Sequence, residues 1–528
     1  MNRRQLFEQF LSLNKRDTSP SVPVVMVVGG SEEHTDPLTL SDVFHLLRRL
    51  GFGATMAQAR GYVGKSAAEV VDELLGTGNE PDPESPGDWI DAWTEDPMGA
   101  DLQTRFQIWN AWARYMDYLA AWWITAMKND PTAIEKITLF WGSHWTTEYE
   151  FDDTKSLPQT LYRQYLLLRR HRLGDLRDMS LEITVDAAML AYLGGTYNIV
   201  GAPNENYARE LMELFLTGLG WYTEGDVKEA ARVLTGFKTQ LYSDSPAPNE
   251  ELPYHKDGRY KSWFDASSHD TGAKQFLGQT IPARTSDNNT AYQVKHDEIG
   301  RLIEIIFEVR GEAVSRFIAE KMYRFFVFSS PTEVDADFIS EIAQTYREAD
   351  FNIRVLLKAI FTSKHFFDPS LRGCQIKTPI EYVAGLLRQL GTNTADPQRW
   401  TSNMDQAVMD PPTVAGWPGY RSWISTNTYP QRRSFAQTVI NGISDVDMNT
   451  WIRTIDDYND VHKFVANVVA FLLPVPVSPE RLAYYEQAVL QNAPDYDWQL
   501  ILDDPAAAAS RTRNLLVTIS RAPDFQLC

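Results

Sequence analysis

Residues 101–127 read DLQTRFQIWNAWARYMDYLAAWWITAM, and this stretch indicates the fold class most directly. Its aromatic and aliphatic side chains recur at helical spacing and leave little polar face. The next segment begins at Asp130-Pro131, where an N-cap residue is followed by proline at the first helical position. We therefore predict a long helix over 101–127 at the centre of the fold, followed by a helix that carries His144.

Helical periodicity continues along most of the chain, and no convincing set of alternating strands appears. Glycines end a short amphipathic helix at Gly51-Phe52-Gly53, and Thr223 with Asp226 starts another helix in the manner of a capping box. The sequence therefore predicts an all-α fold, in which a multi-helix globular domain is joined to a smaller C-terminal helical part.

Changes in composition set the expected domain limits. Residues 1–39 are punctuated by proline and glycine, and we expect an N-terminal arm there. Residues 40–435 are expected to form a helical core domain, which a loop-rich insertion at 240–294 interrupts. Loops of that length in a helical domain tend to cover or build a site. Residues 436–528 are expected to form a C-terminal helical subdomain.

Charge and cysteine content narrow the kind of partner. The 528 residues include 70 acidic and 50 basic side chains, and the formal charge of −20 repels a phosphate backbone. We therefore expect no nucleic-acid partner. Cys374 and Cys528 are too few for a disulfide framework and lack the paired spacing of a thiolate zinc site.

The N-terminus carries the paired arginines of a twin-arginine export signal at Arg3-Arg4. The residues that follow are too polar for the apolar region of such a signal, so a cytoplasmic location is favoured and export is the alternative. The apolar run at 22–28 is too short to cross a bilayer, and we expect no membrane span.

A polar stripe runs along the helix that we predict over 204–217. It consists of Asn206, Arg209, Glu210 and Glu213, spaced so that they share one face beside an apolar seam. The stripe is either a solvated face with intrahelical ion pairs, or a site. In the second interpretation Glu210 and Glu213 ligate a metal or act as acid and base, while Arg209 holds an anionic group.

Two further positions carry histidine. His144 closes an aromatic run and is either a packed core residue or a metal ligand. His269 and Asp270 are adjacent in the insertion, where the aspartate either bonds its own turn or joins the histidine as base, ligand or anion site. A rigid turn at Trp417 is expected to be a packing corner, and a stacking platform for a sugar ring is the alternative.

Over about residues 40 to 435, the order of these motifs resembles that of the bacterial domain-of-unknown-function family 1800. The matching residues are 45–53, 140–141 with His144, 206–214, 222–223 with Asp226, 269–270 with Lys274, and 416–418. The family usually reads Phe-Trp-His-x-His-Phe where this chain has Gly142 and Trp145, and this departure counts against a two-histidine site. The resemblance also implies a partner from a second uncharacterised family, number 1501.

The resemblance adds weight to the polar motifs, among them His45 and Asp226. We expect six of these side chains to share one pocket, namely His144, Arg209, Glu210, Glu213, His269 and Asp270. Imidazoles, carboxylates and a guanidinium inside an aromatic shell are typical of a hydrolase or a hard-metal site. We also expect Arg209 to be anchored by Glu213, Asp226 or another carboxylate, because an unpaired buried charge is costly.

These motifs lead to an expected function of hydrolase type. The expected catalytic residues are Arg209, Glu210, Glu213, His269 and Asp270. In the metal-dependent form of the site, the ligands of a divalent metal are His144, Glu210, Glu213 and His269. The alternative is a non-catalytic scaffold or binding protein for a partner protein or a polysaccharide; a small-molecule ligand suits either role.

Overall fold

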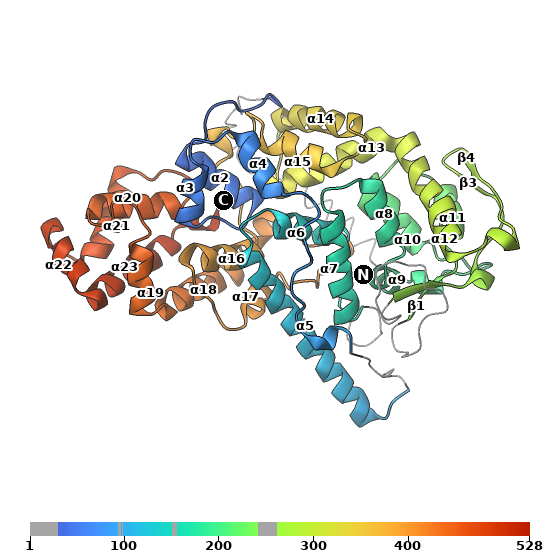
Figure 1. Ribbon diagram of the computed structural model, residues 1–528, viewed down its shortest axis with the longest axis horizontal. Helices are drawn as coiled ribbons and strands as arrows, with labels where there is room; N and C mark the ends of the chain where they lie inside the picture. The colour runs from blue at the N-terminus through green and yellow to red at the C-terminus, as the bar shows by residue number, and fades with distance from the viewer. Residues whose placement is uncertain (1–29, 93–96, 98, 150–155, 241–260) are drawn as a thin grey trace.

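The computed structural model describes residues 30–92, 97, 99–149, 156–240 and 261–528 (Figure 1). The Arg3-Arg4 pair and the first 29 residues of the expected arm lie outside this range. Within the described residues the chain is predominantly α-helical, as predicted, and no helix there combines the length and apolar character that crossing a bilayer requires.

The helices of the N-terminal half are α2 (Leu40–Leu50), α3 (Met56–Tyr62), α4 (Ala67–Leu75), α5 (Leu102–Asn129), α6 (Ile134–His144), α7 (Pro158–His171), α8 (Leu176–Thr184), α9 (Ala187–Tyr192), α10 (Glu205–Glu210) and α11 (Glu224–Val233). The π-helix η3 (Leu211–Leu216) continues α10 directly. The predicted capping box at the start of α11 is confirmed, because Thr223 and Asp226 bond each other's backbone.

The second half contains α12 (Ala291–Gln293), the π-helix η6 (Val294–Ile299), α13 (Gly300–Phe326), α14 (Glu333–Glu348), α15 (Ile353–Phe361), α16 (Pro379–Leu390), α17 (Pro397–Asn403), α18 (Thr428–Gly442), α19 (Asp445–Ile452), α20 (Val461–Leu472), α21 (Pro479–Leu490), α22 (Trp498–Asp503), α23 (Pro505–Ser520) and the short 3₁₀ turn η10 (Pro523–Gln526). Helices α19 to α23 gather at one end of the molecule, and α10, α11 and the strands lie at the other (Figure 1).

Four short strands accompany the helices. They form two antiparallel pairs, β1 (Phe237–Gln240) with β2 (Lys261–Phe264) and β3 (Lys274–Phe276) with β4 (Gln279–Ile281). Three of them lie in the insertion expected to be loop-rich at 240–294. The sequence did not reveal them because runs of three or four residues are too short to display alternation.

Helix α5 differs from its predicted position. Its second half is central, since Trp123 and Met127 are buried. Its first half projects from the body (Figure 1), and Leu102 and Phe106 are 70% and 57% exposed. Periodicity shows that aromatic side chains share a face, but it does not show whether another element covers that face.

The start of α6 also differs from the prediction. The helix begins at Ile134, with Ala133 as its N-cap, three residues later than Asp130-Pro131 suggested. Asp130 still serves this helix end, because its carboxylate accepts hydrogen bonds of 2.8 Å from the backbone N–H groups of Thr132 and Glu135. Asp130 therefore binds the first turn of α6 from four residues before the helix begins, although it is not the N-cap residue.

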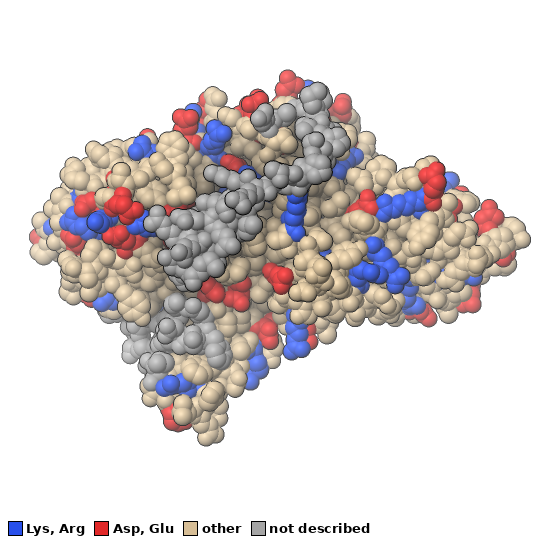
Figure 2. Space-filling model, turned by 180° about the vertical axis from the view of Figure 1, so that it is seen from behind, with Lys and Arg blue, Asp and Glu red and all other residues tan. Residues whose placement is uncertain are grey.

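Most buried apolar side chains between Leu38 and Phe525 form one hydrophobic core, to which the C-terminal helices contribute, and Trp112 and Leu157 form a second, small cluster. The end of the chain packs beside α2, where Nη1 of Arg49 lies 2.7 Å from Sγ of Cys528. On the face shown in Figure 2, Lys and Arg side chains are interspersed with Asp and Glu side chains.

Candidate functional site

The polar stripe of α10 and η3 is an ion-paired face. Arg209 donates hydrogen bonds of 2.8 Å to both carboxylate oxygens of Glu224 and one of 3.3 Å to Glu205. Its anchors are therefore these two carboxylates, and not Glu213 or Asp226. The hydrogen bonds to Glu224 raise the pKa of Arg209. The Arg209 side chain is 32% exposed, so water shares in solvating its charge.

The two remaining carboxylates of the stripe lie near a tyrosine. The Tyr222 hydroxyl donates a 2.6 Å hydrogen bond to Glu213. Burial, and then the negative charges of Glu213 and Glu210, raise the pKa of Tyr222. Asp226 has a structural role, because it caps α11 and also accepts a 2.8 Å hydrogen bond from the backbone N–H of Leu277.

His269 belongs to a second, fully buried group. Its Nδ1 lies 2.8 Å from the carbonyl oxygen of Thr235, and its Nε2 lies 3.2 Å from a carboxylate oxygen of Glu298. Lys274 binds the other oxygen of that carboxylate. Since both ring nitrogens face oxygen acceptors, neither is available to a metal ion.

Asp270 faces a different partner from its neighbour His269. Its carboxylate accepts hydrogen bonds of 2.8 and 3.2 Å from the guanidinium of Arg232 and one of 2.9 Å from the backbone N–H of Gly272. Burial raises the pKa of Asp270, but these hydrogen bonds outweigh burial and the net pKa is lowered. His269 and Asp270 therefore bind different partners, and they do not form a catalytic dyad.

His144 ends α6 and makes up a third group. Its Nε2 donates a 2.9 Å hydrogen bond to the carbonyl of Phe215, and its Nδ1 accepts one of 3.3 Å from Nζ of Lys321. The same Nζ donates a 2.7 Å hydrogen bond to the carbonyl of Leu214. These carbonyls belong to the last turn of η3, so the lysine and the histidine together cap the C-terminal end of the π-helix.

The electrostatics of this third group are unusual. Burial, together with the charge of Lys321, holds the pKa of His144 well below its ordinary value. Burial also lowers the pKa of Lys321 to about 7. Among the described residues no carboxylate pairs with this lysine. Sequence reasoning did not single out Lys321, because nothing in its local pattern separates it from other lysines of α13.

Five of the six residues expected in one pocket thus each bind partners of their own, namely His144, Arg209, Glu213, His269 and Asp270. His45 is also a packing residue, since its Nε2 lies 3.0 Å from the carbonyl of Phe366 and its ring stacks on that side chain. Across the described ranges, no three His, Cys, Asp or Glu side chains are arranged to hold a metal ion. The expected divalent-metal site is therefore not found in this part of the chain.

The segment that follows α6 contacts the loop between α17 and α18. Thr146 donates its hydroxyl hydrogen to the carbonyl of Val414. Gly416 has φ +84°, and a Cβ at this position would lie 3.0 Å from the carbonyl oxygen of Ser143. Glycine is required here both for the left-handed backbone and for the close approach. Two of the motifs that carry the family resemblance therefore meet at this contact.

Asp410 lies on that loop in a constrained backbone. Met409 before it has φ +58°, a left-handed conformation that is uncommon for a non-glycine residue, and Pro411 follows it. Such conformations persist only where the surroundings hold them, and they cluster at functional sites. The side chain of Asp410 is half-buried, and among the described residues no lysine or arginine pairs with it.

Asp410 and Glu148 form an acidic pair across this contact. Burial raises the pKa of Asp410 to about 6, and the negative charge of Glu148 adds to the effect. Glu148 itself accepts a 3.3 Å hydrogen bond from the Tyr192 hydroxyl. Burial, and then Asp410, raise the pKa of Tyr149 to about 12, and within the described residues the buried Tyr149 hydroxyl has no hydrogen-bond partner. A carboxyl group whose pKa is raised close to a second acidic side chain is a candidate for acid–base chemistry.

A buried chain of hydrogen bonds supports the backbone beside Glu148. The Thr147 hydroxyl donates to the side-chain oxygen of Gln164 at 2.6 Å, and the amide of Gln164 donates to Asp186 at 3.0 Å. Burial raises the pKa of Asp186 to about 7 against the opposing effect of its hydrogen bonds. These hydrogen bonds hold the segment that carries Glu148 against α7 and the start of α9.

The comparisons with known proteins identify a family. A model of the family described as "Protein of unknown function (DUF1800)" matches residues 45–527. No curated protein and no solved structure matches the chain.

Proposed function

The chain belongs to the DUF1800 family, and we propose that it is a hydrolase of the acid–base type whose reacting groups are Asp410 and Glu148. The observation that supports this proposal is the raised pKa of Asp410, about 6, beside a second carboxylate. A carboxyl group with this pKa retains its proton to higher pH than an ordinary aspartic acid, and it can therefore donate that proton under nearly neutral conditions.

In the proposed reaction Asp410 donates its proton to the leaving-group oxygen as the scissile bond breaks. Glu148 removes a proton from water, and the water oxygen forms the new bond to the substrate. One water molecule is consumed: its hydroxyl group joins one product, and the leaving oxygen of the other product gains a proton. Asp410 is then ionised and Glu148 is protonated, and proton exchange with solvent restores the starting states.

A polysaccharide is the substrate class that fits this pair best. Hydrolysis of a glycosidic bond requires an acid for the leaving oxygen and a carboxylate for the attacking water. Aromatic side chains bind sugar rings by stacking, and half-buried Tyr149 and Trp417 belong to the two segments that carry the acidic pair.

This proposal retains the hydrolase class and replaces the residues expected from the polar stripe. Arg209, Glu213 and His269 have partners of their own, and in this proposal they stabilise the fold around α10, α11 and η6. No metal takes part, since the reaction needs only the two carboxyl groups and water.

The alternative is a binding or scaffold protein, and the exposed half of α5 favours it. Leu102, Phe106 and Tyr118 are all more than half exposed on a helix that projects from the body (Figure 1). Exposed apolar side chains of this kind are typical of a docking surface for a partner protein or a polysaccharide. A partner of family 1501 is one such protein.

Release of reducing ends from a panel of polysaccharides tests the proposal. Wild-type protein is compared with Asp410→Asn and Glu148→Gln, and Asp405→Asn is the matched control because Asp405 is an exposed acid on the same loop. We expect hydrolysis by the wild type and the control, and a loss of about a hundredfold or more in the other two variants. Binding without hydrolysis, unchanged in Asp410→Asn, would support the scaffold instead.

A further inference from the structure

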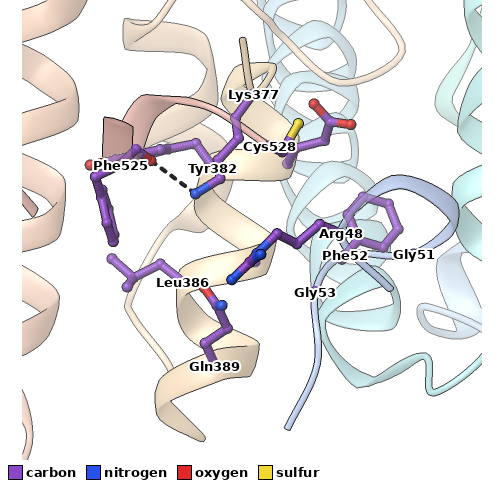
Figure 3. Close-up of a pocket in the computed structure, with 12 residues that line it drawn as sticks. Arg48, Gly51, Phe52, Gly53, Lys377, Tyr382, Leu386, Gln389, Phe525 and Cys528 are labelled. Atoms are coloured by element: carbon purple, nitrogen blue, oxygen red, sulfur yellow. Dashed lines mark hydrogen bonds between the residues drawn. The ribbon is translucent and has the colours of Figure 1, made fainter. Parts of the chain in front are cut away.

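A separate pocket lies between α2, α16 and η10 (Figure 3). It is small and partly open to solvent. One part of the wall is polar and includes Arg48, Lys377 and Gln389. Another part is apolar and includes Phe52 and Phe525. The first motif of the family resemblance, residues 45–53, contributes Arg48 and Phe52 to this wall, but the proposed hydrolase reaction does not use the pocket.

Two cationic side chains enter the pocket from different elements (Figure 3). Arg48, from α2, donates hydrogen bonds of 2.7 and 3.1 Å to the carbonyls of Phe471 and Ala470 through one nitrogen. Lys377, from the segment before α16, donates a 2.9 Å hydrogen bond to the carbonyl of Phe525. A guanidinium has five N–H donors and an ammonium has three, so both groups keep donors for a ligand.

The acidic residue of the wall does not balance these charges. Glu381 is ion-paired with Lys136 and accepts a 2.6 Å hydrogen bond from the backbone N–H of Thr378. A third cation, Arg49, lies behind the wall and contacts Sγ of Cys528 at 2.7 Å. Glu381 is thus shared with Lys136, and Cys528 with Arg49, so cationic side chains outnumber acidic ones around the polar wall.

The protonation equilibria reflect this excess. Burial lowers the pKa of Lys377 to about 7; Arg48 and Arg432 repel its charge, while Cys528 and Glu381 favour it. Burial lowers the pKa of Arg48 to about 10, with Cys528 opposing this effect. An anion placed between the two side chains would offset both the burial and the repulsion.

We propose that this pocket binds an oxyanion, such as a sulfate, phosphate or carboxylate group, between Arg48 and Lys377. The arginine fork and the lysine ammonium supply charge-assisted hydrogen bonds to such a group. Phe52 and Phe525 offer an apolar surface to the rest of a ligand that carries the oxyanion. The ligand is either a free inorganic anion or an oxyanion attached to an apolar body.

Thermal unfolding in sulfate tests the proposal, with chloride at equal ionic strength as the reference for screening. Lys377→Gln removes the charge and keeps an N–H donor for the carbonyl of Phe525. Lys463→Gln is the control, because its side chain is 60% exposed and does not line the pocket. We expect sulfate to raise the unfolding temperature of wild type and control, and to bind Lys377→Gln about tenfold more weakly or worse.

A pH series and a second variant complete the experiment. Sulfate keeps its charge between about pH 6 and about pH 9, so its affinity for the wild type should fall over this range as Lys377 loses its proton. The affinity for Lys377→Gln should stay constant. Arg48→Gln should also bind sulfate more weakly than the wild type. If Lys377→Gln does not fold, Arg48→Gln tests the proposal in its place.

Benzenesulfonate distinguishes the two kinds of ligand. Tighter binding than sulfate points to an oxyanion on an apolar body, and weaker binding points to a free anion. An equal sulfate shift in the wild type, Lys377→Gln and Arg48→Gln would overturn the proposal, and so would a shift no larger than that in chloride.

Discussion

Nζ of Lys321 lies 3.3 Å from Nδ1 of His144 and joins α13 to the end of α6. The same nitrogen lies 2.7 Å from the carbonyl oxygen of Leu214, so it also fixes the end of η3. One cation therefore holds together two motifs of the family resemblance at the point where the sequence led us to expect a metal ligand. Nδ1 of His144 accepts a hydrogen bond from this lysine and is therefore not free to ligate a metal ion.

Lys321→Met should destabilise the protein by about 1–3 kcal/mol at about pH 9, because it leaves Nδ1 of His144 and the carbonyl of Leu214 without their donor. Urea unfolding measures the change. Lys364→Met is the control, since Lys364 is a surface residue paired with exposed Glu32. Equal stability of Lys321→Met and the control variant would contradict the capping role.

The stability contribution of Lys321 should depend on pH. Its pKa is about 7 in the folded protein and 10.5 for an ordinary lysine, so between these values the unfolded chain binds more protons. Wild-type stability, relative to Lys321→Met, should therefore rise as pH increases from about 7 to about 10 and stay level below that range. A constant difference between the two proteins from about pH 6 to about pH 10 would show that the lysine is not desolvated.

Arg209→Ala should cost less than about 1 kcal/mol, because its partner Glu224 is 71% exposed and water can replace the ion pair. Lys136→Met is the contrast. Lys136 and Glu381 are 0% and 8% exposed, and removal of the lysine should cost about 3–5 kcal/mol by leaving a buried carboxylate unpaired. Denaturant unfolding of both variants measures the two losses of stability. A larger loss in Arg209→Ala than in Lys136→Met would contradict the prediction.

Gly416→Ala should destabilise the protein by about 1–3 kcal/mol and lower the proposed hydrolytic activity, because the new Cβ meets Ser143 in a left-handed backbone. The loop that carries Asp410 must then shift away from Glu148. Gly61→Ala is the control, since nothing lies within 4 Å of its added Cβ. Unchanged unfolding temperature and activity in Gly416→Ala would show that the close contact is not needed.

The helices could be predicted from the sequence because their signals are local. Caps and periodicity lie within one segment, and the capping box at Thr223 and Asp226 is an example. The strands β1 to β4 could not be predicted, since each is too short to show an alternating pattern and forms only by pairing with another short strand. The exposure of Phe106 likewise depends on which elements reach α5.

The candidate site was harder to predict than the fold. The spacing on α10 led us to expect that its polar residues share a helix face, but it could not identify Glu224 as the partner of Arg209. Lys321 and Asp410 become distinctive only through residues that are distant in sequence. A constellation of this kind requires the fold, because burial and nearby charges determine the pKa and are not local properties.

The titration of Asp410 tests its role as the proposed acid most directly. The side-chain carboxyl is followed by carbon-13 NMR in protein with labelled aspartate, and Asp410→Asn assigns its resonance. We predict a midpoint near pH 6 in the wild type and a lower midpoint in Glu148→Gln, because that variant removes the neighbouring negative charge. A wild-type midpoint near 3.8, the ordinary value for aspartic acid, would contradict the proposed role of Asp410 as the acid.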